Sequence, residues 1–287
     1  MTDVITVIAS PAFATIQDLG RTGFRDSGVP VSGVADRDSA LLLNAILGND
    51  PDASMIECAV TGGLFRFDCA ATIAVGGASA ALRVNGVSVE PWEPIVIADG
   101  DELQIERIVS GRFVLVAVRG GIDVPVVLGS RSTLVSAAIG GLDGRRLRNG
   151  DRLHVGDCVR ATSDESGSVR AVDGEGPIMV SRGPQASLFD DAAWAAFLDS
   201  EFVVSRASDR SGYRLDGVTF THGGAASMPS EPACVGAIQI PDGGTPIVIM
   251  QDGPTVGGYP KIAVIRSACL SRFAQLAPGD RVRFAVG

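Results

Sequence analysis

The sequence contains few of the residues from which common catalytic and metal-binding motifs are built. Among 287 residues there is one lysine, Lys261, and there are two histidines, His154 and His222. A multi-histidine metal site or a nucleophile activated by histidine has little to draw on, so we predict no metal site. The five cysteines are scattered and never spaced as CxxC, which disfavours a disulfide framework. We expect them to be small buried side chains.

Charge and hydropathy argue against two further classes of protein. The net charge of −9 disfavours a nucleic-acid surface, which needs clustered lysine and arginine. No run approaches the roughly 18 apolar residues of a membrane span. The opening stretch MTDVITVIASPAF carries an acid and no basic n-region, which is not typical of a signal peptide. We therefore expect a cytoplasmic protein that binds neither nucleic acid nor membrane.

Several familiar active-site motifs are also missing. The sequence has no GxxxxGK[ST] phosphate loop, no strand–GxGxxG–helix unit, no HExxH and no GxSxG. His154 lies in an alternating stretch typical of a strand, whereas His222 lies in the loop FTHGGAASMPSEP and is the better functional candidate. The chemistry must then come mainly from other polar residues.

What the sequence does contain is a succession of short strands. Stretches such as DVITVIAS, RFVLVAVRG and TPIVIM are rich in Val and Ile and are bounded by Gly, Pro, Asp or Asn. Strands and helices do not alternate regularly, which disfavours a doubly wound parallel sheet. We predict a mainly β protein of two β-rich modules with a few short covering helices. The polar stretch 161–177 is the best linker candidate, so the predicted modules are 1–165 and 166–287.

Three segments have helical spacing instead. DRDSALLLNAILGND begins at Asp36 and ends at Gly48, which sits where a C-terminal cap belongs. SLFDDAAWAAFLDS has Ser187 as its expected N-cap, with Asp190 three residues later. SACLSRFAQLAPGD gives the third helix, which its Pro-Gly pair ends. Each is expected to cover a sheet face or a barrel end.

One turn pattern occurs three times. DGDELQI (99–105), NGDRLHV (149–155) and PGDRVRF (278–284) share a Gly-Asp turn that leads into an alternating strand. Two explanations stay open. The pattern is either common β-turn chemistry, since Gly and Asp both tolerate the required backbone angles, or the matching strand ends of two related β-modules.

Polar residues gather in turn-rich segments, which a β scaffold would carry as binding loops. Paired glycines let the backbone approach a ligand, and arginine offers a fork for carboxylate or phosphate. Surface turns with weak ion pairs would look similar, but the only lysine and both tyrosines, Tyr213 and Tyr259, fall inside these segments. The segments are 16–39, 55–63, 118–133, 205–217, 227–241 and 250–265.

Taken together, these segments resemble a known family over nearly the whole chain. IQDLGRTGFRDSGVPVSGVADRDS, VRGGIDVPVVLGSRST, SDRSGYRLDG, SEPACVGAIQIP and PTVGGYPKIA are similar to motifs of the carboxyltransferase subdomain A and B family. That family includes proteins named allophanate hydrolase subunit 2, KipA and the C-type subunit of 5-oxoprolinase. Ser211 stands where the family often has Met, and Val256 where it often has Thr. The second difference is expected to alter the hydrogen bonding of a ligand.

The resemblance implies a cyclophilin-like β-barrel and, as partner, a KipI-like B-type subunit. In the 5-oxoprolinase system, the B-type and C-type proteins are linked to ATP-dependent activation of 5-oxoproline, and ring opening to glutamate is completed by an A-type subunit. The first expectation is therefore the C-type subunit of an ATP-dependent 5-oxoprolinase, active only as a complex in which ATP is bound.

Two other functions stay open. In urea amidolyase the corresponding region moves a carboxyl group from carboxybiotin to urea, so the substrate could be urea or another amide. Biotin would then arrive on another protein, because Lys261 lacks the flanking methionines of a biotinylated lysine. The third possibility is a KipA-like regulatory protein that binds a KipI-like kinase inhibitor.

The predicted site residues come from the same motifs. Lys261, Tyr213, Glu231 and Asp209 are candidates for catalysis, Lys261 as a charge clamp and the others for proton handling or substrate orientation. Arginine side chains would bind anionic groups, and paired glycine N–H groups would stabilise an oxyanion. The residues predicted to bind substrate are Arg210, Arg214, Gln239, Gly257, Gly258, Tyr259, Arg119, Gly120, Gly121 and Arg25.

Overall fold

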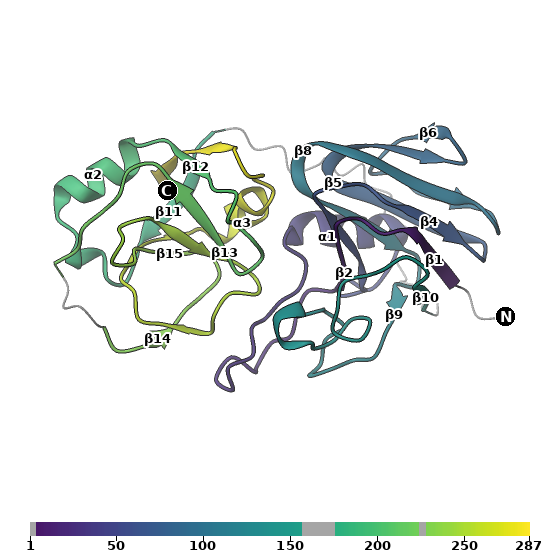
Figure 1. The fold of residues 1–287 in the computed structure, drawn as a ribbon, viewed down its shortest axis with the longest axis horizontal. Coiled ribbons are helices and arrows are strands. Elements are labelled where there is room, and N and C mark those ends of the chain that lie inside the picture. The colour runs from purple at the N-terminus through teal and green to yellow at the C-terminus, as the bar shows by residue number, and fades with distance from the viewer. Residues whose placement is uncertain (1–3, 157–175, 224–227) are drawn as a thin grey trace. The chain divides into compact units, whose positions relative to one another are not determined.

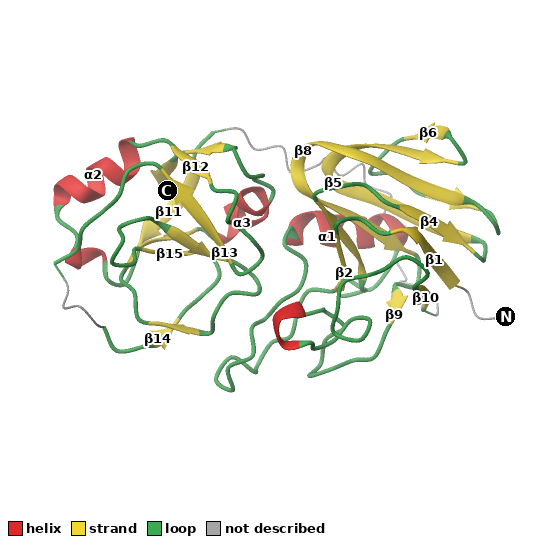
Figure 2. Cartoon of the chain, in the orientation of Figure 1, coloured by secondary structure: helices red, strands yellow, loops and turns green. Residues whose placement is uncertain are grey.

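The computed structural model of the protein describes residues 4–156, 176–223 and 228–287. Strands dominate in both halves, with three short α-helices among the described residues (Figure 2). The predicted mainly β class is confirmed. Two compact units are present: Met1–Thr22 with Ser32–Val172, and Gly23–Val31 with Asp173–Gly287. The predicted boundary at 165/166 lies outside the described residues. The second unit also contains residues 23–31 from the N-terminal part of the chain, which a single boundary cannot express.

The first unit is built on one sheet, in which β2-β3-β8-β4-β1-β10-β9 are neighbours in that order. The long strand β8 pairs with β5 along most of its length and with β3 and β4 on its other side (Figure 1). The strands are β1 (Val4–Ala9), β2 (Phe13–Gln17), β3 (Met55–Ala59), β4 (Leu64–Phe67), β5 (Ala71–Val84), β6 (Val87–Val89), β7 (Ile95–Ile97), β8 (Glu102–Val118), β9 (Ile122–Asp123) and β10 (Arg152–Val155).

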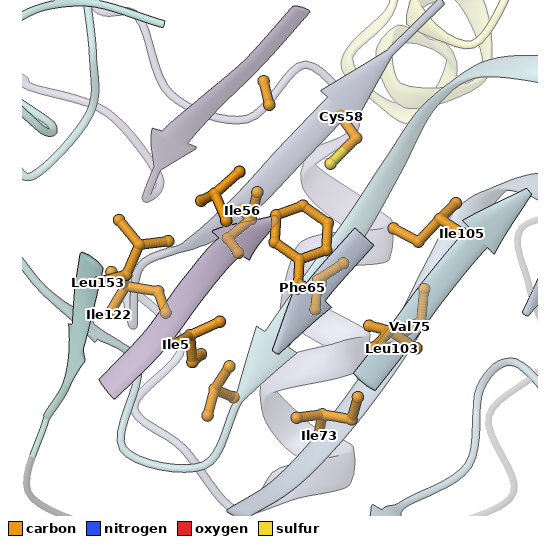
Figure 3. Packing of buried hydrophobic residues seen from close by; sticks show 14 of the residues in the cluster. Ile5, Ile56, Cys58, Phe65, Ile73, Val75, Leu103, Ile105, Ile122 and Leu153 are labelled. Carbon is orange, nitrogen blue, oxygen red and sulfur yellow. The ribbon is translucent and has the colours of Figure 1, made fainter. Parts of the chain in front are cut away.

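Two apolar layers hold this unit together. Alternate residues of the strands form the larger core, part of which, with Ile5, Ile56 and Phe65, is seen in Figure 3. The opposite face of β3, β5 and β8 packs against helix α1 (Arg37–Leu47) through residues such as Leu43 and Leu115. All five residues of β3 are buried, because both faces of that strand are covered.

The caps of α1 confirm the predicted helix. Asp36 is the N-cap, and its carboxylate accepts hydrogen bonds from the Ser39 backbone N–H at 3.0 Å and the Ser39 hydroxyl at 2.6 Å. Gly48 adopts a left-handed conformation with φ of 65°, which glycine enters without steric cost. Both ends of the helix are therefore encoded locally.

The second unit contains an eight-stranded sheet, ordered β19-β12-β13-β16-β15-β18-β11-β20. Its two end strands are separated in the chain by Arg283 alone, so the sheet must curve until its edges nearly meet. This is the nearly closed barrel expected for the unit. The strands are β11 (Ile178–Arg182), β12 (Phe202–Val204), β13 (Gly212–Asp216), β15 (Ala237–Gln239), β16 (Ile247–Ile249), β18 (Lys261–Ile265), β19 (Arg281–Val282) and β20 (Phe284–Val286); β14 (Glu231–Pro232) and β17 (Val256–Gly257) form a separate pair.

The two helices of this unit differ from their predicted ends. Helix α2 (Asp191–Asp199) is capped by Asp190, which accepts from the Ala193 N–H at 2.7 Å; the prediction of Ser187 as the cap was wrong. Ser187 belongs instead to a short 3₁₀ turn at Ala186–Leu188. Helix α3 (Ser267–Ala274) ends before the Pro-Gly pair. Asp190 is the N-cap because its carboxylate accepts a hydrogen bond from the free backbone N–H three residues later.

The three Gly-Asp turns have one geometry. Asp101, Asp151 and Asp280 each accept a hydrogen bond from the backbone N–H three residues earlier, at 2.7–2.8 Å. The preceding glycines have φ of 90°, 86° and 100°. Two of these turns lie in the first unit and one in the second.

The described residues include no helix long and apolar enough to cross a membrane. Of the cysteines, Cys58 and Cys69 are buried as predicted, but Cys234 is exposed because it lies in the turn after β14. Burial raises the pKa of the Cys58 thiol, which keeps that side chain protonated and unreactive. Cys158 lies outside the described residues.

Candidate functional site

Lys261 and Glu231 form an ion pair at the edge of the second-unit barrel. Lys261 is the first residue of β18, and only 3% of its side chain is exposed. Its Nζ donates to Oε1 of Glu231, whose side chain on β14 is 35% exposed. The pair therefore has a buried cation and a carboxylate that reaches the surface.

Gln185 holds both members of this pair. Its Nε2 donates to Glu231 Oε1 at 2.7 Å, and its Oε1 accepts from the Lys261 backbone N–H at 3.2 Å. The turn that carries Gln185 approaches β18 closely, since a Cβ on Gly183 would lie 2.1 Å from the Lys261 carbonyl oxygen. Gln185 was not among the residues predicted from the sequence. The Gly-Pro turn before it is the signal that could have identified it.

Gln239 and Gly257 complete the group. Gln239 lies opposite Lys261 in the register of β15 and β18 and is buried, and Gly257 lies opposite Glu231 in the register of β14 and β17. A Cβ on Gly257 would lie 2.5 Å from Gln239 Nε2, so a larger residue there would displace the amide from its present position. We call Lys261, Glu231, Gln185, Gln239 and Gly257 the Lys261 cluster.

The electrostatics of the cluster favour a charged pair. The hydrogen bond from Lys261 lowers the pKa of Glu231, an effect that partial burial opposes and that Coulomb attraction and Gln185 reinforce. Glu231 is thus an acceptor near neutral pH. A buried ammonium beside a carboxylate can stabilise negative charge that develops on a ligand oxygen while the carboxylate orients an N–H group.

Arg25 is placed near the cluster by the segment Gly23–Val31. Its Nη2 donates to the carbonyl oxygen of Ala233, two residues after Glu231. Gly258 and Tyr259 follow Gly257, and Tyr259 is 46% exposed. The structure thus places Gln239 and Gly257 beside Lys261 and Glu231. Arg25 supports the backbone of the segment that carries Glu231.

Four other predicted residues have different surroundings. Tyr213 is fully buried on β13, which is separated from β18 by two strands of the sheet, and its hydroxyl donates to the Ala274 carbonyl at 2.7 Å. Arg210 makes a buried two-bond contact with Asp252, at 2.9 and 3.1 Å. Asp209 accepts from the backbone N–H groups of its own turn, and Arg214 is exposed. Tyr213 and Arg210 are thus buried, Asp209 stabilises its own turn, and the roles predicted for the four residues stay predictions.

Arg119, Gly120 and Gly121 belong to the first unit. Arg119 Nε donates to the Leu47 carbonyl at 3.2 Å, and the Gly120 N–H donates to Asn49 Oδ1 at 2.9 Å. Both glycines line a cavity of about 310 Å³, which Asp52 and Arg131 also border. Burial raises the pKa of Asp52.

Within the first unit, Asp18 joins residues from two of the motif segments. Its carboxylate accepts from the Gly20 N–H at 2.8 Å, from the Ser130 hydroxyl at 2.6 Å and from the Ser132 hydroxyl. The residues around Asp18 and those around Ser130–Ser132 are therefore held together by a buried polar network. Asp18, Ser130 and Ser132 thus have a structural part in the fold.

The two histidines have different surroundings. His154 lies on β10 opposite Val4 and Asp123, as predicted for a strand residue. His222 lies in a loop with its ring edge against Phe189. No group of three or more His, Cys, Asp or Glu residues suited to a metal ion occurs in the part of the chain that the structure describes.

The chain belongs to the carboxyltransferase domain, subdomain A and B, family, whose profile matches residues 27–286. It is 34% identical over 281 residues to the C-type subunit of 5-oxoprolinase from Escherichia coli K12, a match that covers 98% of this chain and 90% of that protein. It is also 33% identical to urea amidolyase of Saccharomyces cerevisiae, covering 98% of this chain but only 16% of the yeast protein.

Solved structures agree with this assignment. The urea carboxylase of Kluyveromyces lactis superposes with a TM-score of 0.92 at 29% identity, over 100% of this chain and 28% of that one. TTHA0988 superposes with a TM-score of 0.88 at 27% identity, over 99% of this chain and 55% of that one. The same fold therefore occurs as part of longer chains.

Proposed function

We propose that this chain is the C-type subunit of an ATP-dependent 5-oxoprolinase, acting with a KipI-like B-type protein and an A-type protein to open 5-oxoproline to glutamate. The observation that carries the proposal is the match to a free-standing C-type 5-oxoprolinase subunit over 98% of this chain and 90% of its relative. A second such protein, from Haemophilus influenzae, is 30% identical over the same shares.

The Lys261 cluster supports this function chemically. The substrate is a cyclic amide with a carboxylate, and its activation places negative charge on the amide oxygen. The Lys261 ammonium would stabilise that charge, and the Glu231 carboxylate would orient the ring N–H. Gln185 keeps the two groups in place. ATP is assigned to the complex as a whole rather than to residues of this chain.

A second candidate function has its own support. Urea amidolyases of two yeasts are 33–34% identical over at least 96% of this chain. The alternative is transfer of a carboxyl group to urea or another amide from carboxybiotin held on a separate protein. The same cluster would then bind the acceptor amide.

Turnover by the purified proteins separates these functions. This chain is mixed with its B-type and A-type partners, 5-oxoproline and ATP, and glutamate and ADP are measured. The expected result is glutamate formation that requires all three proteins. A parallel reaction supplies urea, labelled bicarbonate, ATP, a biotin carboxylase and a biotin carrier protein.

The outcomes have distinct meanings. Absence of glutamate above background would contradict the proposed function. Label that enters an amide product only with the carrier present would support carboxyl transfer instead. Binding to the B-type partner without turnover in either reaction would favour a KipA-like regulatory role.

A further inference from the structure

The Lys261 cluster contains a buried hydrogen-bond donor that lacks an acceptor. Gln239 is the last residue of β15 and is 6% exposed. Among the described residues, none accepts a hydrogen bond from its Nε2. Buried polar groups are nearly always paired in folded proteins, because an unpaired one loses its bond to water without a replacement. An unpaired amide donor beside an ion pair therefore indicates a place where a ligand oxygen binds.

The same cluster also offers an accessible acceptor, the second carboxylate oxygen of Glu231. Gln185 and Lys261 both donate to Oε1 of Glu231, and no described residue donates to Oε2. The carboxylate is also the more exposed member of the ion pair. Gly257 is close to both groups, since it pairs with Glu231 in register and a Cβ on it would lie 2.5 Å from Gln239 Nε2. The cluster thus presents one donor and one acceptor, both beside Gly257.

We propose that this pair binds an amide whose N–H and carbonyl oxygen lie on the same edge, as in a lactam or a urea. The carbonyl oxygen accepts from Gln239 Nε2, with the Lys261 ammonium beside it, and the N–H donates to Glu231 Oε2. This inference rests on the proposed function, because it describes how the same site selects its substrate.

The geometry of amides explains the selectivity. A five-membered lactam is held in the cis form by its ring, and urea presents an N–H and the carbonyl oxygen on one edge in any orientation. An open-chain secondary amide strongly prefers trans, which places the two groups on opposite edges. Such a molecule can satisfy the donor or the acceptor of the cluster but not both.

Ligand binding to the full chain, alone and with its B-type partner, tests this inference. The probes are 5-oxoproline, 2-pyrrolidone, urea, N-methyl-2-pyrrolidone and N-methylacetamide, followed by saturation-transfer NMR and calorimetry. We expect 5-oxoproline and 2-pyrrolidone to bind at least about tenfold more tightly than the N-methylated and open-chain amides, which lose one of the two bonds. Urea has the same amide edge as 2-pyrrolidone but no ring. If urea binds as tightly as 2-pyrrolidone, the site recognises the edge alone. If urea binds more weakly, the ring also contributes to binding.

Three variants connect the selectivity to named residues. Gln239→Glu keeps the shape of the side chain but replaces the donor by an acceptor, so lactam binding should fall at least about tenfold. Gly257→Ala places a Cβ 2.5 Å from Nε2 and should weaken binding by displacing the amide. Gln104→Glu, at an exposed position of β8, is the matched control and should bind like the wild type. Circular dichroism verifies the fold of each variant.

The results discriminate between this inference and the proposed function. Equal affinity for 2-pyrrolidone and its N-methyl derivative, or unchanged binding in both Gln239→Glu and Gly257→Ala, would overturn the inference. Glutamate production with that binding result would leave the proposed function standing. Selective lactam binding without glutamate from the complete system would retain the inference and overturn the function.

Discussion

Lys261 shows at the scale of one residue why a rare residue type can be informative. Arginine supplies every other positive side chain counted among the 24 of the sequence, yet the position inside the ion pair with Glu231 is lysine. A lysine ammonium is a compact charge on a flexible stem, whereas guanidinium is a wide planar fork. A side chain that is 3% exposed has little room for the larger group.

Replacing Lys261 tests its part in the reaction. In the complete three-protein assay, Lys261→Ala should lower glutamate formation by about 10²-fold, because it removes one charge-stabilising group. Lys261→Arg should also be strongly impaired, since the fork does not fit the buried position. Arg152→Lys, at an exposed position of β10, is the control. Wild-type activity of Lys261→Arg would show that any positive charge is sufficient.

At the scale of elements, close approaches of backbone position the site. The turn after β11 can support Lys261 only because Gly183 lacks a side chain. A Cβ there would lie 2.1 Å from the Lys261 carbonyl oxygen and 3.0 Å from the Ala263 nitrogen, both backbone atoms of β18. Neither atom can move without disturbing the strand.

Gly183→Ala should therefore destabilise the protein by about 1–3 kcal/mol, as overpacking usually does. The matched control is Gly243→Ala, because a Cβ on Gly243 meets no atom within 4 Å and its change should stay within about 0.5 kcal/mol. Urea unfolding measures both. Equal free energies of unfolding for the two variants would contradict this prediction, because they would show that β18 moves aside for the new Cβ without loss of stability.

The repeated Gly-Asp turns are a second feature of this scale. All three use the same aspartate-to-backbone bond, but Asp151 also accepts two hydrogen bonds from Arg145, at 2.7 and 2.9 Å. Burial opposes ionisation of Asp151, and the bonds from Arg145 and Arg148 outweigh it and lower its pKa. Asp280 is exposed and accepts the turn bond.

Asp151→Asn should therefore cost about 1.5–3 kcal/mol, the range for hydrogen bonds to charged groups, and Asp280→Asn less than about 1 kcal/mol. Thermal unfolding of both variants at pH 7 provides the comparison. Equal losses at the two turns would contradict this assignment and indicate that the Arg145 contact adds nothing.

At the scale of the whole molecule, the carboxyl groups set the response to acid. Hydrogen bonds lower the pKa of five described carboxyls, while burial raises that of Asp52. A lowered pKa means that the folded state holds its proton less readily than the unfolded chain does. Protons then bind preferentially to the unfolded state. The five carboxyls are Asp68, Asp101, Asp151, Glu201 and Glu231.

Stability should accordingly fall as the pH drops below about 5, toward and below the ordinary values of 3.8 for Asp and 4.5 for Glu. Urea midpoints measured at about pH 7, 4.5 and 3.5 test this expectation. In Glu231→Gln the urea midpoint should fall less between about pH 7 and 3.5, because one of the five carboxyls with a lowered pKa has been removed. A midpoint that stays constant down to the most acidic of these conditions would contradict the assignment.

The sequence by itself determined the features that depend on local chemistry. Val- and Ile-rich stretches between turn residues predicted a mainly β fold, Asp36 and Gly48 marked the ends of α1, and Gly-Asp pairs predicted three turns. The joint motifs also indicated the family. These features can be predicted without tertiary information, because each depends on residues that are close to one another in the sequence.

Only the tertiary structure decided which of the predicted residues meet. It placed Lys261 against Glu231, thirty positions earlier, and added Gln185, which lies outside the segments predicted to carry the site. It placed Tyr213 in the core and left Tyr259 half exposed, although both lie in turn-rich polar segments. The physical reason is that strand register and the near closure of the barrel bring distant segments together, and no pattern within one segment encodes its partner.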